Sequence, residues 1–222
     1  DYLYRKGYHV YGVRLRGHGT APEDLATQEW QRWYSSASRG YIIMKNCAKN
    51  VSIAGFSMGG GIALLQAANK PGRFASVISV NAPLKLKNIA SKLSPLIVAW
   101  NTLLTKVHVD KWKLEFVENK PENPEINYLR NPVKGTYELA QLMKEVENRL
   151  KNITDPTLVI QASHDPVVDA AGAGKIYSLL GSEEKQLIKV NANHHSILRG
   201  AASFKVYEKI LTFLNDKNIS RS

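Results

Sequence analysis

The stretch that decides the fold covers residues 51–65 and reads Val51-Ser52-Ile53-Ala54-Gly55-Phe56-Ser57-Met58-Gly59-Gly60-Gly61-Ile62-Ala63-Leu64-Leu65. Its β-branched, apolar start predicts a strand, and its end predicts a helix. Between them, Gly55-Phe56-Ser57-Met58-Gly59 matches the G-x-S-x-G pattern of a sharp turn that exposes a serine hydroxyl. Such a turn brings the two glycines together, so we expect a Cβ at either position to clash.

Around this stretch, strands alternate with helices, which predicts a mostly parallel sheet with helices on both faces, an α/β fold. The expected strands cover residues 8–15, 51–56, 74–80, 157–162 and 185–190. The expected helices cover residues 22–41, 58–69, 170–180 and 201–215.

One interval, residues 84–152, breaks this alternation. Apolar residues at helical spacing predict one amphipathic helix over 93–107 and another over 139–150. We interpret the interval as a helical cap inserted into one domain, whose core consists of residues 1–83 and 153–222. Leu96, Trp100 and Leu103 lie on the apolar face of the first helix, and we expect them to contact a substrate. Both apolar stripes could also simply pack on the sheet.

Composition excludes several classes of protein. The 222 residues include a single cysteine, Cys47, so no intramolecular disulfide can form. The net charge of +11 is spread evenly along the chain, which argues against a nucleic-acid-binding stripe. No run of 18 apolar residues predicts a membrane span, and no cluster of His, Cys and acidic residues has the spacing of a metal site.

A serine hydroxyl becomes nucleophilic when a histidine takes its proton and an acid orients that histidine. Asp165 follows the expected strand 157–162, and His195 follows the strand 185–190. With Ser57, they give the order serine, acid, histidine, each after the carboxyl end of a strand, where open α/β sheets place their sites. The sequence therefore predicts a triad of Ser57, Asp165 and His195.

Two alternatives lie beside these residues. Asp169 is four residues beyond Asp165, where its carboxylate would suit the start of the following helix. His194 precedes His195, and only one of these neighbours can face the serine. We favour His195 because Ile197 and Leu198 then begin a buried element.

Four segments together resemble the α/β-hydrolase superfamily, and within it the bacterial carboxylesterase and monoacylglycerol-lipase-like branch. They are residues 14–25 (RLRGHGTAPEDL), 55–60 (GFSMGG), 163–168 (SHDPVV) and 195–198 (HSIL). The resemblance implies Ser57 as nucleophile, Asp165 as acid, His195 as base, and the Met58 N–H as one oxyanion donor. It also implies an acyl-enzyme intermediate and no cofactor.

The chain departs from this family at its beginning. Members carry further strands before the helix in which Asp1 lies, and the loop after one of them supplies the second oxyanion donor. No segment here matches that loop. We therefore expect either a chain that lacks the N-terminal strands or a strand 8–15 that pairs in another way.

The sequence thus predicts a serine hydrolase that cleaves carboxylic esters of apolar acyl chains. A thioesterase or amidase on the same fold is the near alternative, and a truncated, non-catalytic chain that binds lipid or protein is the second. The expected partner is a small-molecule ester. Among protein assemblies, we consider a homodimer. We expect a cytoplasmic location, with any signal peptide upstream of Asp1.

Overall fold

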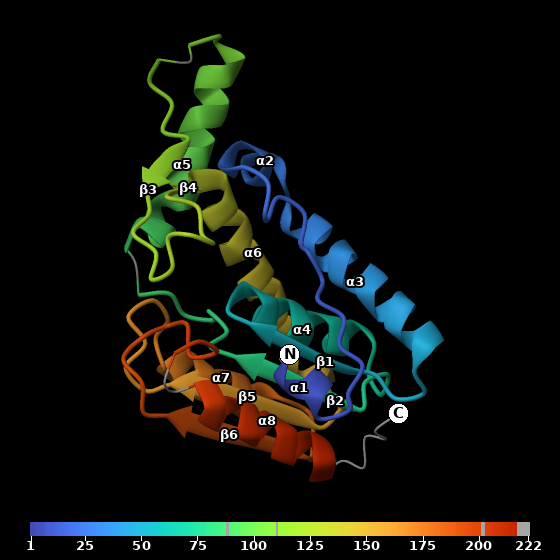
Figure 1. The fold of residues 1–222 in the computed structure, drawn as a ribbon. Coiled ribbons are helices and arrows are strands. Elements are labelled where there is room, and N and C mark those ends of the chain that lie inside the picture. Colours follow the sequence, from blue (N-terminus) through green and yellow to red (C-terminus); the bar gives the residue numbers. More distant parts are fainter. Residues whose placement is uncertain (88, 110, 201–202, 217–222) are drawn as a thin grey trace.

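The structure is a computed structural model that describes residues 1–87, 89–109, 111–200 and 203–216. Within these residues, the centre is a four-stranded sheet with the order β1-β2-β5-β6 and every neighbouring pair parallel (Figure 1). The strands are β1 (Ser52–Phe56), β2 (Ser76–Val80), β5 (Thr157–Ala162) and β6 (Lys185–Val190). Because all four run the same way, their carboxyl ends meet at one edge of the sheet.

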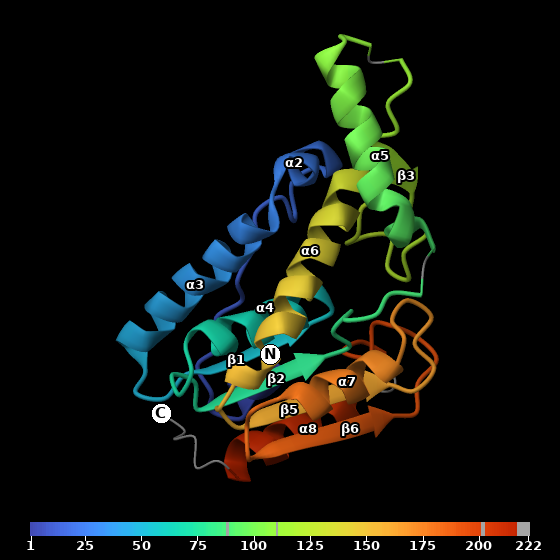
Figure 2. The ribbon, with the colours of Figure 1, turned by 180° about the vertical axis from the view of Figure 1, so that it is seen from behind.

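Helices cover both faces of this sheet, as the sequence predicts. One face carries α4, α6 and α7, and the other carries α1 and α8 (Figure 2). Their bounds are α1 (Tyr2–Arg5), α4 (Met58–Asn69), α6 (Val133–Arg149), α7 (Ala171–Leu179) and α8 (Ser203–Asp216). Side chains alternate along a strand, so Val77 packs into the first layer while its neighbour Ile78 packs into the second. The expected start of the last helix, at residue 201, lies outside the described residues.

Residues 84–152 contain α5 (Ile89–Lys106) and α6, joined through a small antiparallel pair, β3 (Phe116–Glu118) and β4 (Arg130–Pro132). Leu142, Met143 and Val146 of α6 are buried in the main core, so this helix packs as part of the layer over the sheet. A 3-10 turn, η1 (Leu150–Asn152), follows α6. In contrast, α5 stands out from the sheet (Figure 1). The division into a core and a cap stays a prediction.

The expected strand over residues 8–15 is not a strand in the structure. A strand requires a backbone partner. Here a cleft of about 330 Å³, lined on one side by Tyr11 and Val13 and on the other by β1, separates this segment from the sheet. The segment packs instead against α3 (Trp30–Cys47), where a Cβ on Gly40 would overlap Val13. The strand predicted from the alternating pattern of residues 8–15 is therefore wrong.

The expected helix over residues 22–41 is two helices, α2 (Pro22–Thr27) and α3. The carboxylate of Glu138 on α6 accepts the backbone N–H of Trp30 at 3.1 Å, which gives α3 a new first turn. Such a long-range contact leaves no local pattern in the sequence. Within the described residues, no helix is both long and apolar enough to cross a membrane.

A buried carboxylate fixes the start of β2 beside the start of β5. The two oxygens of Asp155 accept the N–H groups of Phe74 at 2.7 Å and Gly72 at 3.1 Å. Two residues later β5 begins at Thr157, whose hydroxyl donates to the Asp155 carbonyl oxygen. The turn before β2 is therefore tied to the chain that enters β5.

We predict that Asp155→Ala lowers the free energy of unfolding by about 3 kcal/mol, because two N–H groups lose their acceptor and one of them is buried. Urea denaturation followed by circular dichroism measures the change. Asp155→Asn keeps one carbonyl acceptor and should lose less. A urea midpoint for the alanine variant equal to that of the wild type would contradict the assignment.

Candidate active site

Ser57 lies at the junction of β1 and α4 with a φ of 53°, a value that residues other than glycine rarely adopt. Such a conformation costs about 1–3 kcal/mol and persists where surrounding contacts fix it. The Ser57 N–H donates to the Val80 carbonyl oxygen at 2.8 Å. The Ser57 carbonyl oxygen accepts the N–H groups of Gly60 and Gly61. The neighbouring strand and the first turn of α4 therefore hold the turn.

The two glycines of the G-x-S-x-G pattern have different roles. A Cβ on Gly55 would overlap the carbonyl group of Gly59, as expected. A Cβ on Gly59 would meet nothing within 4 Å, so the expected clash there is wrong. The reason is directional, because Gly59 approaches Gly55 with its carbonyl group and not with its α-hydrogens.

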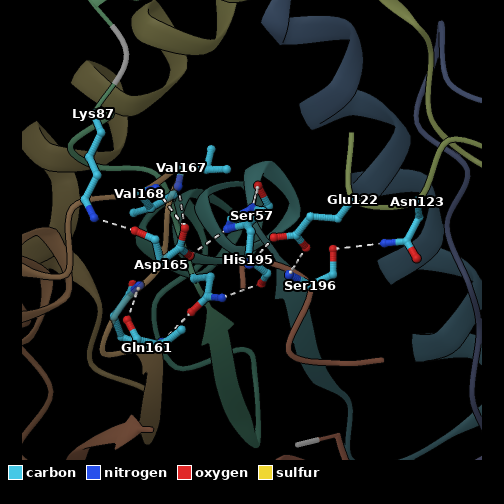
Figure 3. Close-up of polar contacts among 12 residues, drawn as sticks. Ser57, Lys87, Glu122, Asn123, Gln161, Asp165, Val167, Val168, His195 and Ser196 are labelled. Carbon is cyan, nitrogen blue, oxygen red and sulfur yellow. Dashed lines mark hydrogen bonds and ion pairs between the residues drawn. The ribbon is translucent and has the colours of Figure 1, made fainter. Parts of the chain in front are cut away.

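The structure brings the three predicted triad side chains into one chain of hydrogen bonds (Figure 3). His195 Nε2 lies 2.9 Å from Ser57 Oγ, and His195 Nδ1 lies 2.7 Å from Asp165 Oδ2. The three residues follow β1, β5 and β6 at the shared carboxyl edge of the sheet. The Asp165 side chain has no exposed surface and that of His195 is 13% exposed, so solvent competes little for these bonds.

The electrostatics of Asp165 set the tautomer of His195. Burial raises the pKa of the Asp165 carboxyl, but hydrogen bonds from His195, Val168 and Val167 outweigh it and leave the pKa below its ordinary value. Oδ1 accepts the N–H groups of Val167 at 2.8 Å and Val168 at 2.9 Å. An ionised carboxylate can only accept. His195 therefore donates from Nδ1, which leaves Nε2 free to accept the Ser57 proton.

The two alternatives considered from the sequence lie in other contacts. The Asp169 carboxylate accepts the N–H of Ala171 at the start of α7 and pairs with the Lys85 ammonium group at 2.6 Å. The hydrogen bond from Lys85 holds the pKa of the Asp169 carboxyl below its ordinary value. His195, and not His194, bonds to both Ser57 and Asp165.

Further contacts immobilise His195 from the side of the sheet. The ring of Phe56 packs on the imidazole with centroids 4.9 Å apart. Asn81 Nδ2 donates to the His195 carbonyl oxygen at 2.7 Å, and Asn81 Oδ1 accepts the Ala162 N–H at 2.8 Å. The Lys87 ammonium group donates to the carbonyl oxygen of Asp165.

Sequence reasoning missed Asn81, although a signal was available. Asn81 directly follows β2 and adopts a φ of 48°, a conformation that asparagine tolerates better than most residues. A polar residue of this type at the carboxyl end of a central strand indicates a possible site contact. Glu122 lies in the segment between β3 and β4 and accepts the His195 N–H. The sequence around Glu122 contains no comparable sign of this contact.

Met58 is the first residue of α4, where helix geometry leaves its N–H without an intrahelical acceptor. This is the position expected of an oxyanion donor. A cavity of about 160 Å³ has Met58 in its wall. Apolar side chains form much of the rest, among them Leu25, Trp33, Pro132 and Leu139. His18 also lines it, and burial lowers the pKa of the His18 imidazole despite a hydrogen bond with the Arg16 carbonyl.

The three residues expected to contact substrate lie on α5. Leu96, Trp100 and Leu103 are 69%, 50% and 53% exposed. Their role stays a prediction. Within the described residues, no group of three or more His, Cys, Asp or Glu side chains is placed to hold a metal ion.

Comparison with known proteins now supplies a family. The sequence profile described as serine aminopeptidase, S33, matches residues 1–201. The chain belongs to this family of α/β hydrolases. The S33 family is one of serine hydrolases, so the protein is an enzyme of that class.

Two relatives are similar in sequence to most of this chain. A thermostable monoacylglycerol lipase of Bacillus sp. (strain H-257) is 26% identical over 86% of this chain and 73% of its own. A carboxylesterase of Bacillus subtilis is 25% identical over 96% of this chain and 83% of its own. A solved structure from work on two metagenome-derived lipolytic enzymes, LipS and LipT, has a TM-score of 0.84 at 23% identity, covering 97% of this chain and 85% of that one. At that identity, the structural likeness shows the fold.

We predict opposite outcomes for alanine at the two glycines. Gly55→Ala should abolish labelling of Ser57 by a fluorophosphonate probe, because a Cβ cannot fit against the Gly59 carbonyl group. Gly59→Ala places its Cβ in open space and should label like the wild type. Labelling rates and melting temperatures measure both effects. Equal rates for the two variants would contradict this account of the turn.

We predict that Asp165→Asn slows fluorophosphonate labelling by about 10,000-fold, because an amide favours the wrong His195 tautomer. Asp169→Asn is the matched control and should label normally.

Since the folded-state pKa of Asp165 is lowered, its carboxylate stabilises the fold above the ordinary aspartate pKa. That contribution is lost as the pH falls through the lowered value. The stability difference between wild type and Asp165→Asn should therefore shrink in acid, which urea titrations at several pH values would detect.

Proposed function

We propose that the protein hydrolyses carboxylic esters, with Ser57 as nucleophile, His195 as general base and Asp165 as the acid that orients it. The observation that carries the proposal is the chain of hydrogen bonds at 2.7 and 2.9 Å from Asp165 through His195 to Ser57. A serine without a catalytic role would not be expected in a strained turn that directs its hydroxyl at an oriented imidazole.

Each step of the proposed reaction uses one of these three side chains or the Met58 N–H. Ser57 Oγ attacks the ester carbonyl carbon while its proton passes to His195 Nε2. The carbonyl oxygen becomes negative and accepts the Met58 N–H, and Asp165 stabilises the imidazolium. The tetrahedral intermediate expels the alcohol, which takes the proton from Nε2, and an acyl-Ser57 ester remains. Water then attacks this ester by the same route and releases the carboxylic acid.

Two observations support an ester with an apolar acyl group as the substrate. Relatives of the chain are named as a monoacylglycerol lipase and a carboxylesterase. The cavity of about 160 Å³ beside Met58 has a largely apolar wall.

An amidase on the same fold is the second candidate, and the family description, serine aminopeptidase, favours it. The triad chemistry is identical, and the leaving group differs. A thioesterase uses the same groups again. Chromogenic ester, thioester and anilide substrates with the same acyl group separate the three by their values of kcat/KM.

We predict that the protein hydrolyses p-nitrophenyl butyrate and that Ser57→Ala reduces kcat to the background rate. Loss of the nucleophile alone removes the covalent route. A kcat/KM higher for butyryl p-nitroanilide than for the ester would favour the amidase. Equal rates of ester hydrolysis with and without Ser57 would overturn the proposed function and favour a non-catalytic role.

A further inference from the structure

The segment between β3 and β4 reaches the loop that carries His195. From this segment, Glu122 Oε1 accepts the backbone N–H of His195 at 2.6 Å, and Glu122 Oε2 accepts that of Ser196 at 2.9 Å (Figure 3). Its neighbour Asn123 donates from Nδ2 to the Ser196 hydroxyl at 3.3 Å. One carboxylate therefore binds the consecutive N–H groups of His195 and Ser196, and the His195 side chain is the one that bonds to Ser57.

The charge of Glu122 suits this contact. Partial desolvation raises the pKa of its carboxyl, but hydrogen bonds from the N–H groups of His195 and Ser196 outweigh that effect and leave the pKa below the ordinary value. The ionised carboxylate has an acceptor oxygen for each N–H group, which a neutral side chain of similar size lacks. Hydrogen bonds to an ionised acceptor are also the stronger kind.

The far end of the same segment is fixed to another part of the molecule. The Tyr128 hydroxyl donates to the Gly17 carbonyl oxygen at 3.0 Å and accepts the Thr20 N–H at 2.9 Å. Glu122 is therefore carried by a segment that is attached on both sides of the site. Asp165, Asn81 and Phe56, which also hold His195, belong to the sheet and its edge. Glu122 comes instead from residues 84–152, the predicted insertion.

We propose that Glu122 is a positioning residue, which holds the His195 backbone so that Nε2 stays within hydrogen-bond distance of Ser57 Oγ. The proposal rests on the proposed function, because it assigns His195 as the base. It makes residues 84–152 part of the machinery that orients the base, in addition to any contact that they make with substrate.

A purely structural role predicts a different result. Glu122 itself is exposed, so water can replace its carboxylate on the two N–H groups at little cost in stability. Water, however, is not attached to β3 and β4 and cannot fix the loop. Loss of Glu122 should therefore leave the melting temperature almost unchanged and slow the chemical step.

The test compares Glu122→Ala with the matched control Glu125→Ala, which removes an exposed carboxylate three residues along the same segment. We expect Glu122→Ala to lower kcat for p-nitrophenyl butyrate by about 10- to 100-fold, the range that a small misplacement of a reacting group produces. KM should stay close to the wild-type value. Fluorophosphonate labelling of Ser57, which needs the base but not the substrate alcohol, should slow in parallel. Glu125→Ala should match the wild type in all three measurements.

Two further variants complete the test. Glu122→Gln keeps the size and one acceptor, so it should lose less than the alanine variant, and it carries the test if Glu122→Ala does not fold. Ser57→Ala checks the proposed function separately. If Ser57→Ala is inactive while both Glu122 variants keep the wild-type kcat, the positioning role is overturned and the proposed function stands. A loss confined to KM would also overturn it, because Glu122 would then contact substrate. If Ser57→Ala is as active as the wild type, the proposed function and the positioning role both fail.

Discussion

The close approach of Gly55 to the carbonyl group of Gly59 is the constraint on which the site depends. It lets β1 turn into α4 within a single residue, and that residue, Ser57, takes a positive φ as a result. The same turn places the first N–H of α4 beside the serine hydroxyl. The proposed nucleophile and the proposed oxyanion donor thus arise from one local geometry, which the rest of the sheet only has to support.

The parallel sheet supplies that support at its carboxyl edge. β2 lies between β1 and β5, and the residue after it, Asn81, bonds at once to the end of β5 and to the His195 loop after β6. Ser57 in turn donates its N–H to Val80, the last residue of β2. A strand that carries none of the three residues therefore sets the spacing between Ser57 and His195.

The contact among Ser57, Asp165 and His195 could be predicted because it depends on local features: a glycine-flanked serine and two polar residues in the loops that follow the expected strands 157–162 and 185–190. The Glu122 contact could not, because it joins two loops 73 positions apart in sequence. Residues 8–15 show the opposite error. Their alternating pattern is local, but pairing depends on a neighbour in space, and a cleft lies where that neighbour would be. Gly59 was misjudged because sequence reveals a small residue and not the direction in which it faces.

The position of β1 also bears on how the molecule loses its order. Within the described residues, β1 pairs with β2 alone, and its other side lines a cleft of about 330 Å³. Native proteins open in cooperative units, and those with few buried contacts open first. β1 is partly accessible along its length, whereas β5 is buried throughout. The amide protons of β1 should therefore exchange with solvent before those of β5, so the turn that holds Ser57 would be lost while the centre of the sheet is still folded.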